Sequence, residues 1–469
     1  MDVPIISASL NLTKSCNLRC SYCFTGGKRA EVISFDTAKK AIDFLIKSAM
    51  TSEPLVGQNG MRQLNISFWG GEPLMEWELL QKIVLYAEGV RPEGLALSFG
   101  GTTNGTLLTT EKFDFLDKHR IFFLLSLDGT AETHDKHRKR CDGTGSQAVI
   151  VENLKAVLRK WPFYRVRMSP YPERIDHFYE DCEYLIKLGV DYLYYSPVYE
   201  HDWKREHWDT WKDQCFKVVD LLGSLQRQGR TVRVEHFSSY INGSDGQQWP
   251  CGAGRQYVGI DTDGSIWPCH RFVKFEDERP WQEKEMCFGH IDHGITKPEV
   301  RDRFINFEAK SCAGKECLKN SPCHGGCYAA NHDLEGDIEK ACKKICEYVE
   351  MQREVSRYYK DTVNPPVDQR VDVQGGICKN MCYLQNTPNE IIGVDPRSTL
   401  TCHCDHAVYN GPAGPDVAIP LTPERREALL NRVVRPQDVL NELYAMKMQM
   451  GTLIHTVNHL ASIITDRAA

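Results

Sequence analysis

The 469-residue chain lacks the features that would place it at a membrane or on nucleic acid. Its N-terminal stretch, MDVPIISASLNLTKSC, has neither the basic region nor the small-residue cleavage site of a signal peptide. No run approaches the roughly 18 uninterrupted apolar residues of a membrane span. Neither sign of charge dominates: 57 basic and 63 acidic residues leave a net charge of −6, which gives no electrostatic case for nucleic acid. We therefore expect a cytoplasmic protein with no membrane and no nucleic-acid partner.

Cysteine is the residue type in excess. Hydrophobic residues make up 41% and charged residues 26%, as in an ordinary globular protein, and the length suggests about three domains. The 19 cysteines, however, fall mainly in four groups, at 16–23, 251–269, 312–346 and 378–404. In a large cytosolic chain, grouped cysteines more often bind metals or clusters than form disulfides.

Short apolar runs alternate with amphipathic helical stretches up to about residue 230. The runs are rich in β-branched, leucine and aromatic residues, as buried strands are. Alternation of this kind predicts a parallel sheet with helices packed outside it. Six units are too few for a full barrel, so the expected fold class is α/β, a partial (β/α)6 TIM barrel over 1–230 with ligands at the C-terminal strand ends. The expected strands are 5–12, 63–69, 95–101, 121–127, 164–169 and 191–196, and the expected helices are 35–50, 75–89, 110–118, 146–160, 175–188 and 205–227.

After residue 231 the pattern breaks into short segments punctuated by glycine, proline and cysteine. We expect a cysteine-rich domain over 231–360 that closes on a helix at 338–360. A cysteine-containing C-terminal extension over 361–469 would follow and end in a helix from 435 to 464.

The first cysteine group, KSCNLRCSYCF, places Cys16, Cys20 and Cys23 in a loop after the first strand. Thiolates are the usual ligands of iron–sulfur clusters. Three protein ligands to a [4Fe-4S] cluster would leave one iron open for a small molecule. A structural zinc site is the alternative, but it needs four ligands and no fourth lies nearby in the sequence.

This C-x3-C-x-aromatic-C loop resembles the signature of the radical S-adenosylmethionine (SAM) superfamily. Further motifs follow in the order that the family leads one to check: WGGEP at 69–73, TTNGT at 102–106, SLDG at 126–129 and HDKHR at 134–138. Glycines in WGGEP would let backbone carbonyls approach the SAM ammonium group. The resemblance implies SAM-binding roles for Tyr22, Gly70, Gly71, Glu72, Pro73, Thr102, Asn104, Ser126, Asp128 and Arg138.

The second group resembles the SPASM domain, which binds two auxiliary [4Fe-4S] clusters. Cys251 and Cys269 form C-x12-G-x4-C around Gly264, and C-x4-C-x5-C-x3-C follows, where the family has x2 in its first interval. The resemblance implies a first auxiliary cluster on Cys251, Cys269 and Cys327. It implies a second on Cys312, Cys317, Cys323 and Cys346, with Cys342 as the alternative ligand.

Two questions about these ligands stay open. The fourth position of the first auxiliary cluster is either filled by Cys287 or is an open iron that binds a substrate thiolate. Zinc is the alternative to clusters in this half of the chain. The last group consists of Cys378, Cys382, Cys402 and Cys404. Four cysteines suffice for a further cluster or a zinc ion, and the other interpretation is free thiols or a redox pair.

By resemblance, a reduced cluster cleaves SAM to a 5′-deoxyadenosyl radical, which abstracts hydrogen from the substrate, while auxiliary clusters carry an electron away. An external electron donor such as flavodoxin or ferredoxin is implied. Proteins with this pairing of domains commonly modify peptides, so we expect a thioether, C–C or C–O bond made in a ribosomally made precursor peptide. The alternatives are a modifier of a small molecule such as a sugar and a non-catalytic iron–sulfur electron-transfer protein.

His270 is the one candidate for acid–base chemistry. In PCHRF it stands where the anaerobic sulfatase maturases carry an aspartate, a departure that argues against formylglycine formation. It is either a catalytic base or a structural histidine. The substrate, the bond formed and the fate of SAM are not specified by the sequence.

Overall fold

The structure, a computed structural model, describes residues 3–53, 61–161, 164–238, 251–312, 323 and 325–363. Some of the expectations lie outside these residues: Cys317, Cys378, Cys382, Cys402, Cys404, nearly all of the extension over 361–469 and its helix from 435 to 464.

The described strands form one eleven-stranded sheet in the order β11-β10-β9-β8-β1-β2-β3-β4-β5-β6-β7. Strands β8 and β1 to β7 run parallel to one another, and β9, β10 and β11 are antiparallel additions beside β8. The bounds are β1 Ser7–Thr13, β2 Arg62–Gly70, β3 Leu95–Thr103, β4 Phe122–Ser126, β5 Arg165–Met168, β6 Tyr192–Tyr195, β7 Arg233–Val234, β8 Tyr257–Ile260, β9 Ser265–Trp267, β10 Gly289–His290 and β11 Gly294–Ile295.

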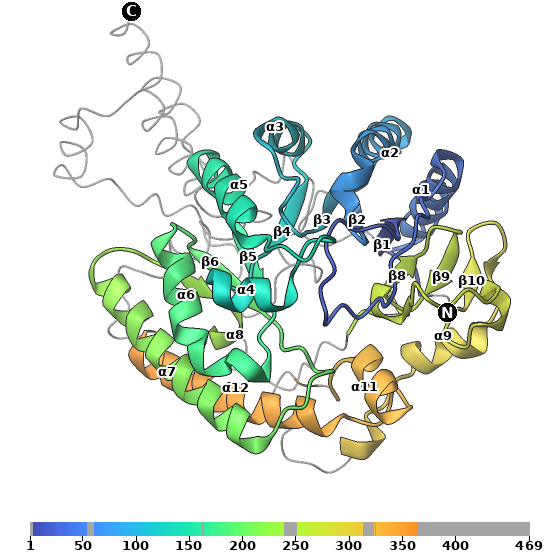
Figure 1. Ribbon diagram of the computed structural model, residues 1–469. Coiled ribbons are helices and arrows are strands. Elements are labelled where there is room, and N and C mark those ends of the chain that lie inside the picture. The colour runs from blue at the N-terminus through green and yellow to red at the C-terminus, as the bar shows by residue number, and fades with distance from the viewer. Residues whose placement is uncertain are drawn as a thin grey trace, which may run out of the picture.

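Helices connect the parallel strands and lie in an arc outside them (Figure 1). All six expected strands and the six expected helices between them are present, with ends shifted by at most three residues. The α-helices are α1 Phe35–Ala49, α2 Trp77–Val90, α3 Thr110–Lys118, α4 Ala131–His137, α5 Gln147–Lys160, α6 Phe178–Lys187, α7 Arg205–Arg227, α8 Glu235–Ser238, α9 Pro298–Ile305, α11 Tyr328–Glu335 and α12 Lys343–Thr362; the short 3-10 helices are η1 Pro73–Glu76, η2 Pro172–His177, η3 His270–Phe272, η4 Trp281–Glu283 and η5 Lys310–Cys312.

The main core lies between the strands and these helices. Leu125 of β4, Val166 of β5 and Leu193 of β6 are fully buried members of it. Because side chains alternate along a strand, the residues next to them face the opposite, inner side of the sheet. The inner side carries the polar residues of the sequence motifs.

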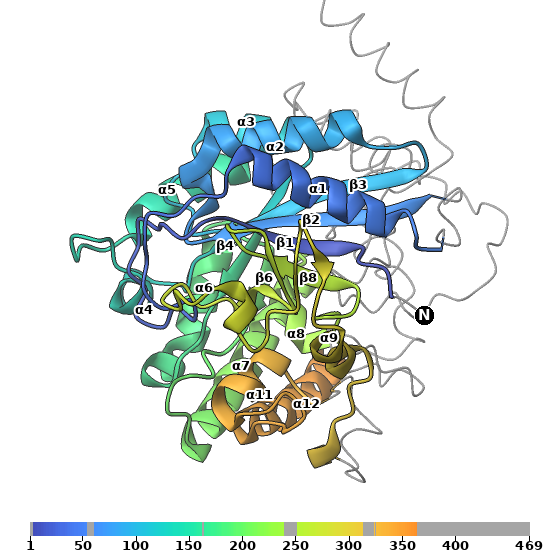
Figure 2. The same ribbon diagram turned by 90° about the vertical axis from the view of Figure 1, so that its right-hand side faces the viewer.

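The chain after residue 230 continues the same sheet. Strand β8 pairs with the free side of β1, which the sequence did not predict. At the other end of the arc, α12 packs against α7 and α8, as both views show (Figures 1 and 2). The cysteine-rich segment therefore flanks the parallel strands at both ends.

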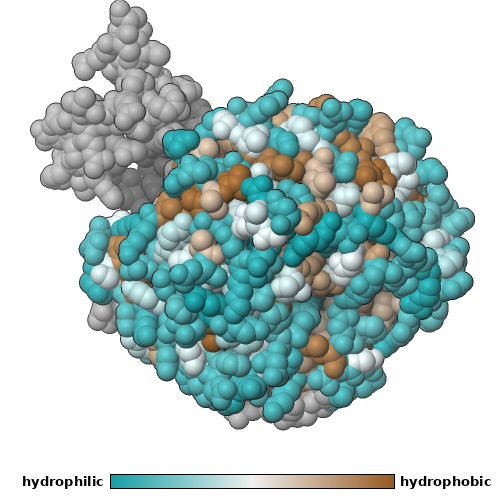
Figure 3. Space-filling view, viewed as in Figure 1, coloured by the Kyte–Doolittle hydropathy of each residue, from teal (hydrophilic) through white to brown (hydrophobic). Residues whose placement is uncertain are grey.

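The face of the molecule in Figure 3 is mainly hydrophilic, with small hydrophobic areas between polar ones. Among the helices of the described ranges, none has the length and apolar character needed to cross a membrane.

Candidate active site

The first cysteine loop leaves the end of β1 and returns toward α1. The thiols of Cys16, Cys20 and Cys23 are free and partly buried, and the Cys23 backbone N–H donates to the Cys20 carbonyl at 3.1 Å. Burial and the nearby Glu72 raise the pKa of Cys16 to about 12. Burial would also raise the pKa of Cys23, but the Lys28 ammonium, 2.9 Å from its sulfur, outweighs this and lowers it. One cation is therefore in place to stabilise a thiolate in this loop.

The glycines of WGGEP bring the backbone after β2 against this loop. The Gly71 N–H donates to Thr13 O at 2.7 Å, and the Glu72 N–H donates to Ser15 O at 2.9 Å. A Cβ on Gly71 would lie 1.9 Å from Ser15 O and 3.0 Å from the Cβ of Cys16. Only glycine permits this approach, which locks the loop to the end of β2.

The Glu72 carboxylate is buried and already hydrogen-bonded within the protein. It accepts from the N–H groups of Leu74 at 3.0 Å and Asn104 at 2.7 Å, and from the Thr103 hydroxyl at 2.8 Å. Burial raises its pKa to about 6 despite these three donors. Pro73, the next residue, begins the short helix η1. Through its hydrogen bonds with Thr103 and Asn104, Glu72 joins the end of β2 to the end of β3.

Asn104 and Thr103 lie at the site, and Thr102 does not join their network. The Asn104 amide donates to Asn17 Oδ1 at 2.8 Å and lies 3.8 Å from the Cys16 sulfur. Thr102 is exposed and its side chain makes no hydrogen bond within the described residues. Alternation along β3 explains why Thr103, which the motif analysis did not select, reaches Glu72 instead.

Tyr22, Asp128 and Arg138 form a buried triad at the end of β4. The Tyr22 hydroxyl donates to Asp128, and the Arg138 guanidinium donates to both Asp128 oxygens, at 2.7 and 3.2 Å. The guanidinium also lies 5.3 Å from the Tyr22 ring centre and 3.0 Å from the Ser169 hydroxyl. Burial favours a higher pKa for Asp128, but Arg138 outweighs it and the pKa is lowered.

Two of the three guanidinium nitrogens of Arg138, Nε and Nη2, donate to Asp128 and Ser169. The resemblance implied that it binds the SAM carboxylate, whereas here it is paired with Asp128 and Ser169. Ser126, two residues before Asp128, is buried and makes no side-chain hydrogen bond within the described residues.

His270 follows Cys269 and packs against the loop that carries Cys16, Cys20 and Cys23 (the catalytic loop). Its ring centre lies 5.3 Å from that of Trp69 and 5.8 Å from that of Phe24, and its Nδ1 lies 2.6 Å from the Tyr257 hydroxyl. Burial, with Arg271 and Arg167 nearby, lowers its pKa to about 3. An imidazole with such a pKa is neutral at pH 7 and a weak proton acceptor.

The resemblance implied a first auxiliary cluster on Cys251, Cys269 and Cys327. Burial raises the pKa of Cys251 to about 11 and also raises that of Cys269, and the nearby Cys327 adds to both shifts. Cys287 is fully buried, and its sulfur lies 3.4 Å from the Gly289 carbonyl oxygen. Burial raises the pKa of Cys287 to about 11, and the charges that act on it come from Asp263 and Lys297.

The other cysteines of this half lie around α11 and α12. Cys312 and Cys342 are buried, Cys323 is partly buried and Cys346 is exposed. Cys342 immediately precedes α12, and burial raises the pKa of its thiol although the backbone N–H groups of Lys344 and Ile345 oppose this.

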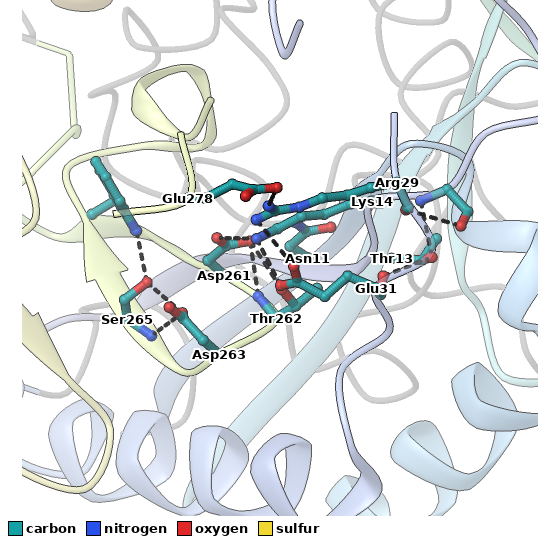
Figure 4. Close-up of polar contacts among 12 residues, drawn as sticks. Asn11, Thr13, Lys14, Arg29, Glu31, Asp261, Thr262, Asp263, Ser265 and Glu278 are labelled. Carbon is teal, nitrogen blue, oxygen red and sulfur yellow. Dashed lines mark hydrogen bonds and ion pairs between the residues drawn. The ribbon is translucent and has the colours of Figure 1, made fainter. Parts of the chain in front are cut away.

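A buried ion network ties the catalytic loop to β8 (Figure 4). The Lys14 ammonium lies 2.7 Å from Glu31 and 3.0 Å from Asp261, and the Asn11 amide donates to Asp261 at 2.6 Å. Sequence analysis missed this group. The only available signal was a lysine directly before the first cluster cysteines.

The donor sets fit iron–sulfur clusters better than single ions. Within the described ranges, no three His, Cys, Asp or Glu side chains converge on one point that could hold a metal ion. A cluster does not need such a point, because each thiolate binds a different iron at its own corner. The partly buried loop of Cys16, Cys20 and Cys23, with Lys28 beside it, therefore fits a [4Fe-4S] cluster with one open iron.

Comparison with known proteins identifies the class. Residues 10–185 match the radical SAM superfamily, so this chain contains a radical SAM domain and is a radical SAM enzyme. Its cofactors are [4Fe-4S] clusters and SAM.

More specifically, the chain is related to SPASM-type, peptide-modifying radical SAM enzymes. It is 21% identical to the serine-type anaerobic sulfatase-maturating enzyme of Klebsiella aerogenes, over 67% of this chain and 77% of that protein. It is 24% identical to the radical SAM cyclopropyl synthase TigE of Paramaledivibacter caminithermalis, over 76% of each. A solved structure of anSMEcpe with bound AdoMet and the Cp18Cys peptide shares the fold, with a TM-score of 0.60 and 19% identity over 77% of this chain and all of that one.

Proposed function

We propose that this enzyme abstracts hydrogen from a peptide or protein and oxidatively forms a thioether, C–C or C–O bond during maturation of a ribosomally made peptide. The observation that carries the proposal is the contact between the residue after Cys23 and the residues after Cys269. Phe24, which follows Cys23, packs on the His270 ring and lies 5.2 Å from the Arg271 guanidinium, directly after Cys269. An electron released at the substrate would have a short route to an auxiliary cluster.

Cys16, Cys20 and Cys23 would hold the catalytic cluster, and the Gly70–Gly71 backbone would receive the SAM ammonium group. When bound, cluster and SAM together supply the radical that abstracts hydrogen. The protein's own part is positioning. Glu72 fixes the ends of β2 and β3, and Asp128 with Arg138 fixes the Tyr22 ring, which lies in the same loop as the cysteines. The partial-barrel arrangement would place Glu72 and the Tyr22 ring beneath the substrate.

The first auxiliary cluster is proposed to bind Cys251, Cys269 and Cys327, with its fourth iron open. The charges that affect the pKa of Cys287 come from Asp263 and Lys297, whereas Cys327 affects both Cys251 and Cys269, and this difference supports the choice over a fourth protein thiolate. A substrate thiolate would then be able to bind the open iron before a thioether bond forms.

A formylglycine-forming reaction is not proposed. The sulfatase maturases carry an aspartate where this chain has His270, and the pKa of His270 near 3 makes it a poor base. We assign His270 a positioning role through Tyr257, which also hydrogen bonds Ser9 of β1. The electron donor is proposed to be a flavodoxin or ferredoxin.

The test is an anaerobic reaction of the reconstituted enzyme with SAM and dithionite, given either cysteine-containing synthetic peptides or a pool of simple sugars. The proposal predicts that peptides stimulate 5′-deoxyadenosine formation and lose two hydrogen atoms by mass spectrometry. Stimulation by the sugar pool alone would establish the small-molecule alternative instead.

A further inference from the structure

We propose that a basic patch beside the catalytic loop docks an acidic electron-donor protein. The basic patch consists of Arg19, Lys136, Lys139 and Arg140. The proposal rests on the proposed function, which needs an external electron donor, and it names the surface on which that donor binds. None of the four cations was assigned a role from the sequence.

Two segments far apart in the sequence lie against each other at this patch. The Arg19 N–H donates to the Lys139 carbonyl at 2.7 Å, and the Ser21 N–H donates to the His137 carbonyl at 3.1 Å. Both views accordingly show the loop after β1 beside α4, the helix that ends at His137 (Figures 1 and 2). Residues 137–140 therefore form an edge of the loop that carries the cluster cysteines.

The two ends of the catalytic loop are covered, whereas its middle is exposed. At the start of the loop, the Glu72 N–H donates to Ser15 O at 2.9 Å, which holds the end of β2 against it. At the other end, the Phe24 ring packs on the His270 ring. Between them Arg19 is exposed. A protein that approaches the cluster from outside can therefore reach the loop at Arg19.

The four cations of the basic patch lie at the surface without a carboxylate partner. Three are exposed, and Arg140 is half-buried. The guanidinium of Arg19 donates to Cys16 O at 2.6 Å, and that of Arg140 donates to Gly145 O at 3.2 Å. Across the ranges that the structure describes, none of the four forms an ion pair. The two backbone contacts orient charges of the patch and neutralise none of them.

The carboxylates nearest in the sequence are held by other groups. Asp135 accepts from two backbone N–H groups at the start of α5, at 2.7 and 2.9 Å. Glu132 lies 3.4 Å from the Arg174 guanidinium. Asp142 accepts from the N–H and the hydroxyl of Thr144, at 2.9 and 2.6 Å. The basic patch therefore keeps a net positive charge.

Charge complementarity selects an acidic protein as the partner. The whole chain carries a net charge of −6, so an acidic protein gains nothing from its overall charge. The basic patch reverses the sign locally, and a local field of this kind steers and orients a charged partner. Electron-transfer complexes are commonly small and weak, so a patch of four cations suffices for one.

The location favours the electron donor over the substrate. The proposed substrate lies between the catalytic loop and the segment after Cys269, which Phe24 contacts. The basic patch is instead built from α4 and the residues after it, on the edge of the loop formed by 137–140. In the docked complex the donor would lose one electron and the catalytic cluster would gain it, with no bond made or broken.

The test compares two electron donors in the reconstituted, SAM-loaded holoenzyme. One is a reduced acidic flavodoxin, and the other is reduced methyl viologen, a small cation that needs no docking surface. Formation of 5′-deoxyadenosine is timed with each donor, and the affinity for oxidised flavodoxin is measured by isothermal titration.

The variant is Lys136→Glu/Lys139→Glu, because neither side chain makes a hydrogen bond within the described residues and the contacts of the loop are left intact. Lys136→Arg/Lys139→Arg preserves the charge. The matched control is Lys82→Glu/Lys118→Glu, which makes the same change in net charge at exposed positions of α2 and α3.

We expect the Lys136→Glu/Lys139→Glu enzyme to bind flavodoxin, and to accept electrons from it, at least about tenfold less well than the parent at about 10 mM salt. The difference should shrink as salt is raised, because salt screens charges. With methyl viologen this variant should keep the rate of the parent. The arginine variant and the matched control should behave as the parent with both donors.

Equal flavodoxin affinity in the parent and the Lys136→Glu/Lys139→Glu variant overturns the proposal. An equal loss of rate with both donors also overturns it, because the damage then lies in the catalytic loop. A variant that keeps the flavodoxin rate but loses stimulation by peptides would assign the patch to the substrate. A parent that binds flavodoxin through the patch but cleaves SAM with neither donor would count against the proposed function and not against the docking surface.

Discussion

Lys14 and Asp261, which come from opposite halves of the chain, form a buried ion pair 3.0 Å long (Figure 4). Their side chains are 2% and 1% exposed. Lys14 ends the stretch that leads into Cys16, and Asp261 directly follows β8. The pair therefore fixes the start of the catalytic loop to the segment that leads to Cys269.

Replacing Lys14 should lower the free energy of unfolding. Lys14→Met leaves the Asp261 carboxylate buried without the Lys14 cation, and breaking a buried pair costs about 3–5 kcal/mol of unfolding free energy. Denaturant unfolding of the apoprotein measures the loss. Adding Asp261→Asn to Lys14→Met should recover part of it, because no unpaired charge is then buried.

The matched control is Lys40→Met. Lys40 also bridges the two halves, at 2.8 Å from Asp292, but both side chains are exposed. Exposed pairs contribute about 1 kcal/mol or less. Equal losses of unfolding free energy in the Lys14 and Lys40 variants would show that burial does not increase the contribution of the Lys14 pair to stability.

Gly71→Ala should displace the catalytic loop. Its Cβ would lie 1.9 Å from Ser15 O, a rigid backbone atom, so the cysteine loop has to move. We predict loss of most SAM binding, and reduced iron in the first cluster, in a protein that still folds. Isothermal titration with SAM and iron analysis report the two effects.

Gly27→Ala serves as control, because it lies in the same loop with no atom within 4 Å of the added Cβ. It should keep both iron and SAM binding. A Gly71→Ala protein indistinguishable from Gly27→Ala would disprove the tight approach between WGGEP and the loop.

Asp181 should make stability depend on pH. Burial raises its folded-state pKa to about 6, against roughly 4 in an unfolded chain. Between these values the folded protein keeps a proton that the unfolded chain has released. Its stabilising contribution is therefore complete below about pH 4 and lost as pH rises through 6, by up to about 3 kcal/mol.

Asp181→Asn tests this sign. Asparagine can still accept from the Thr130 N–H and hydroxyl through Oδ1 but does not titrate. Relative to the parent, the variant should therefore gain stability from pH 4 to pH 7 in denaturant unfolding. The exposed Asp302→Asn on α9 should show no such gain. A variant whose advantage falls with rising pH would contradict the raised pKa.

Much of the fold followed from local sequence pattern. Alternating apolar runs and amphipathic stretches located β1 to β6 and their helices, because each element buries one face against its neighbours in sequence. The pairing of β8 with β1 was not predictable in this way. Strands of two to four residues carry little periodic signal, and the partner lies far away in the sequence.

Part of the candidate site was predictable because its motifs are local in the sequence. Short motifs located Glu72, Asn104 and Asp128 at strand ends, but motifs do not say which side chains pair. Arg138 is paired with Asp128, whereas no hydrogen bond or ion pair from the described part of the chain reaches the Arg167 guanidinium. Likewise, much of the aromatic-rich segment at 192–211 proves to be core packing: Trp203, Trp208 and Trp211 stack on one another beside Tyr348 of α12.

Counting iron and sulfide in anaerobically purified protein, beside a Cys16/Cys20/Cys23→Ala triple variant, tests the central claim most directly. One catalytic and two auxiliary [4Fe-4S] clusters predict about twelve irons per chain in the parent and about eight in the variant. The variant should also form no 5′-deoxyadenosine from SAM. A parent with nearer sixteen irons would add a cluster on Cys378, Cys382, Cys402 and Cys404. A parent holding only about four irons together with zinc would contradict the auxiliary clusters, and with them the oxidative reaction proposed for this enzyme.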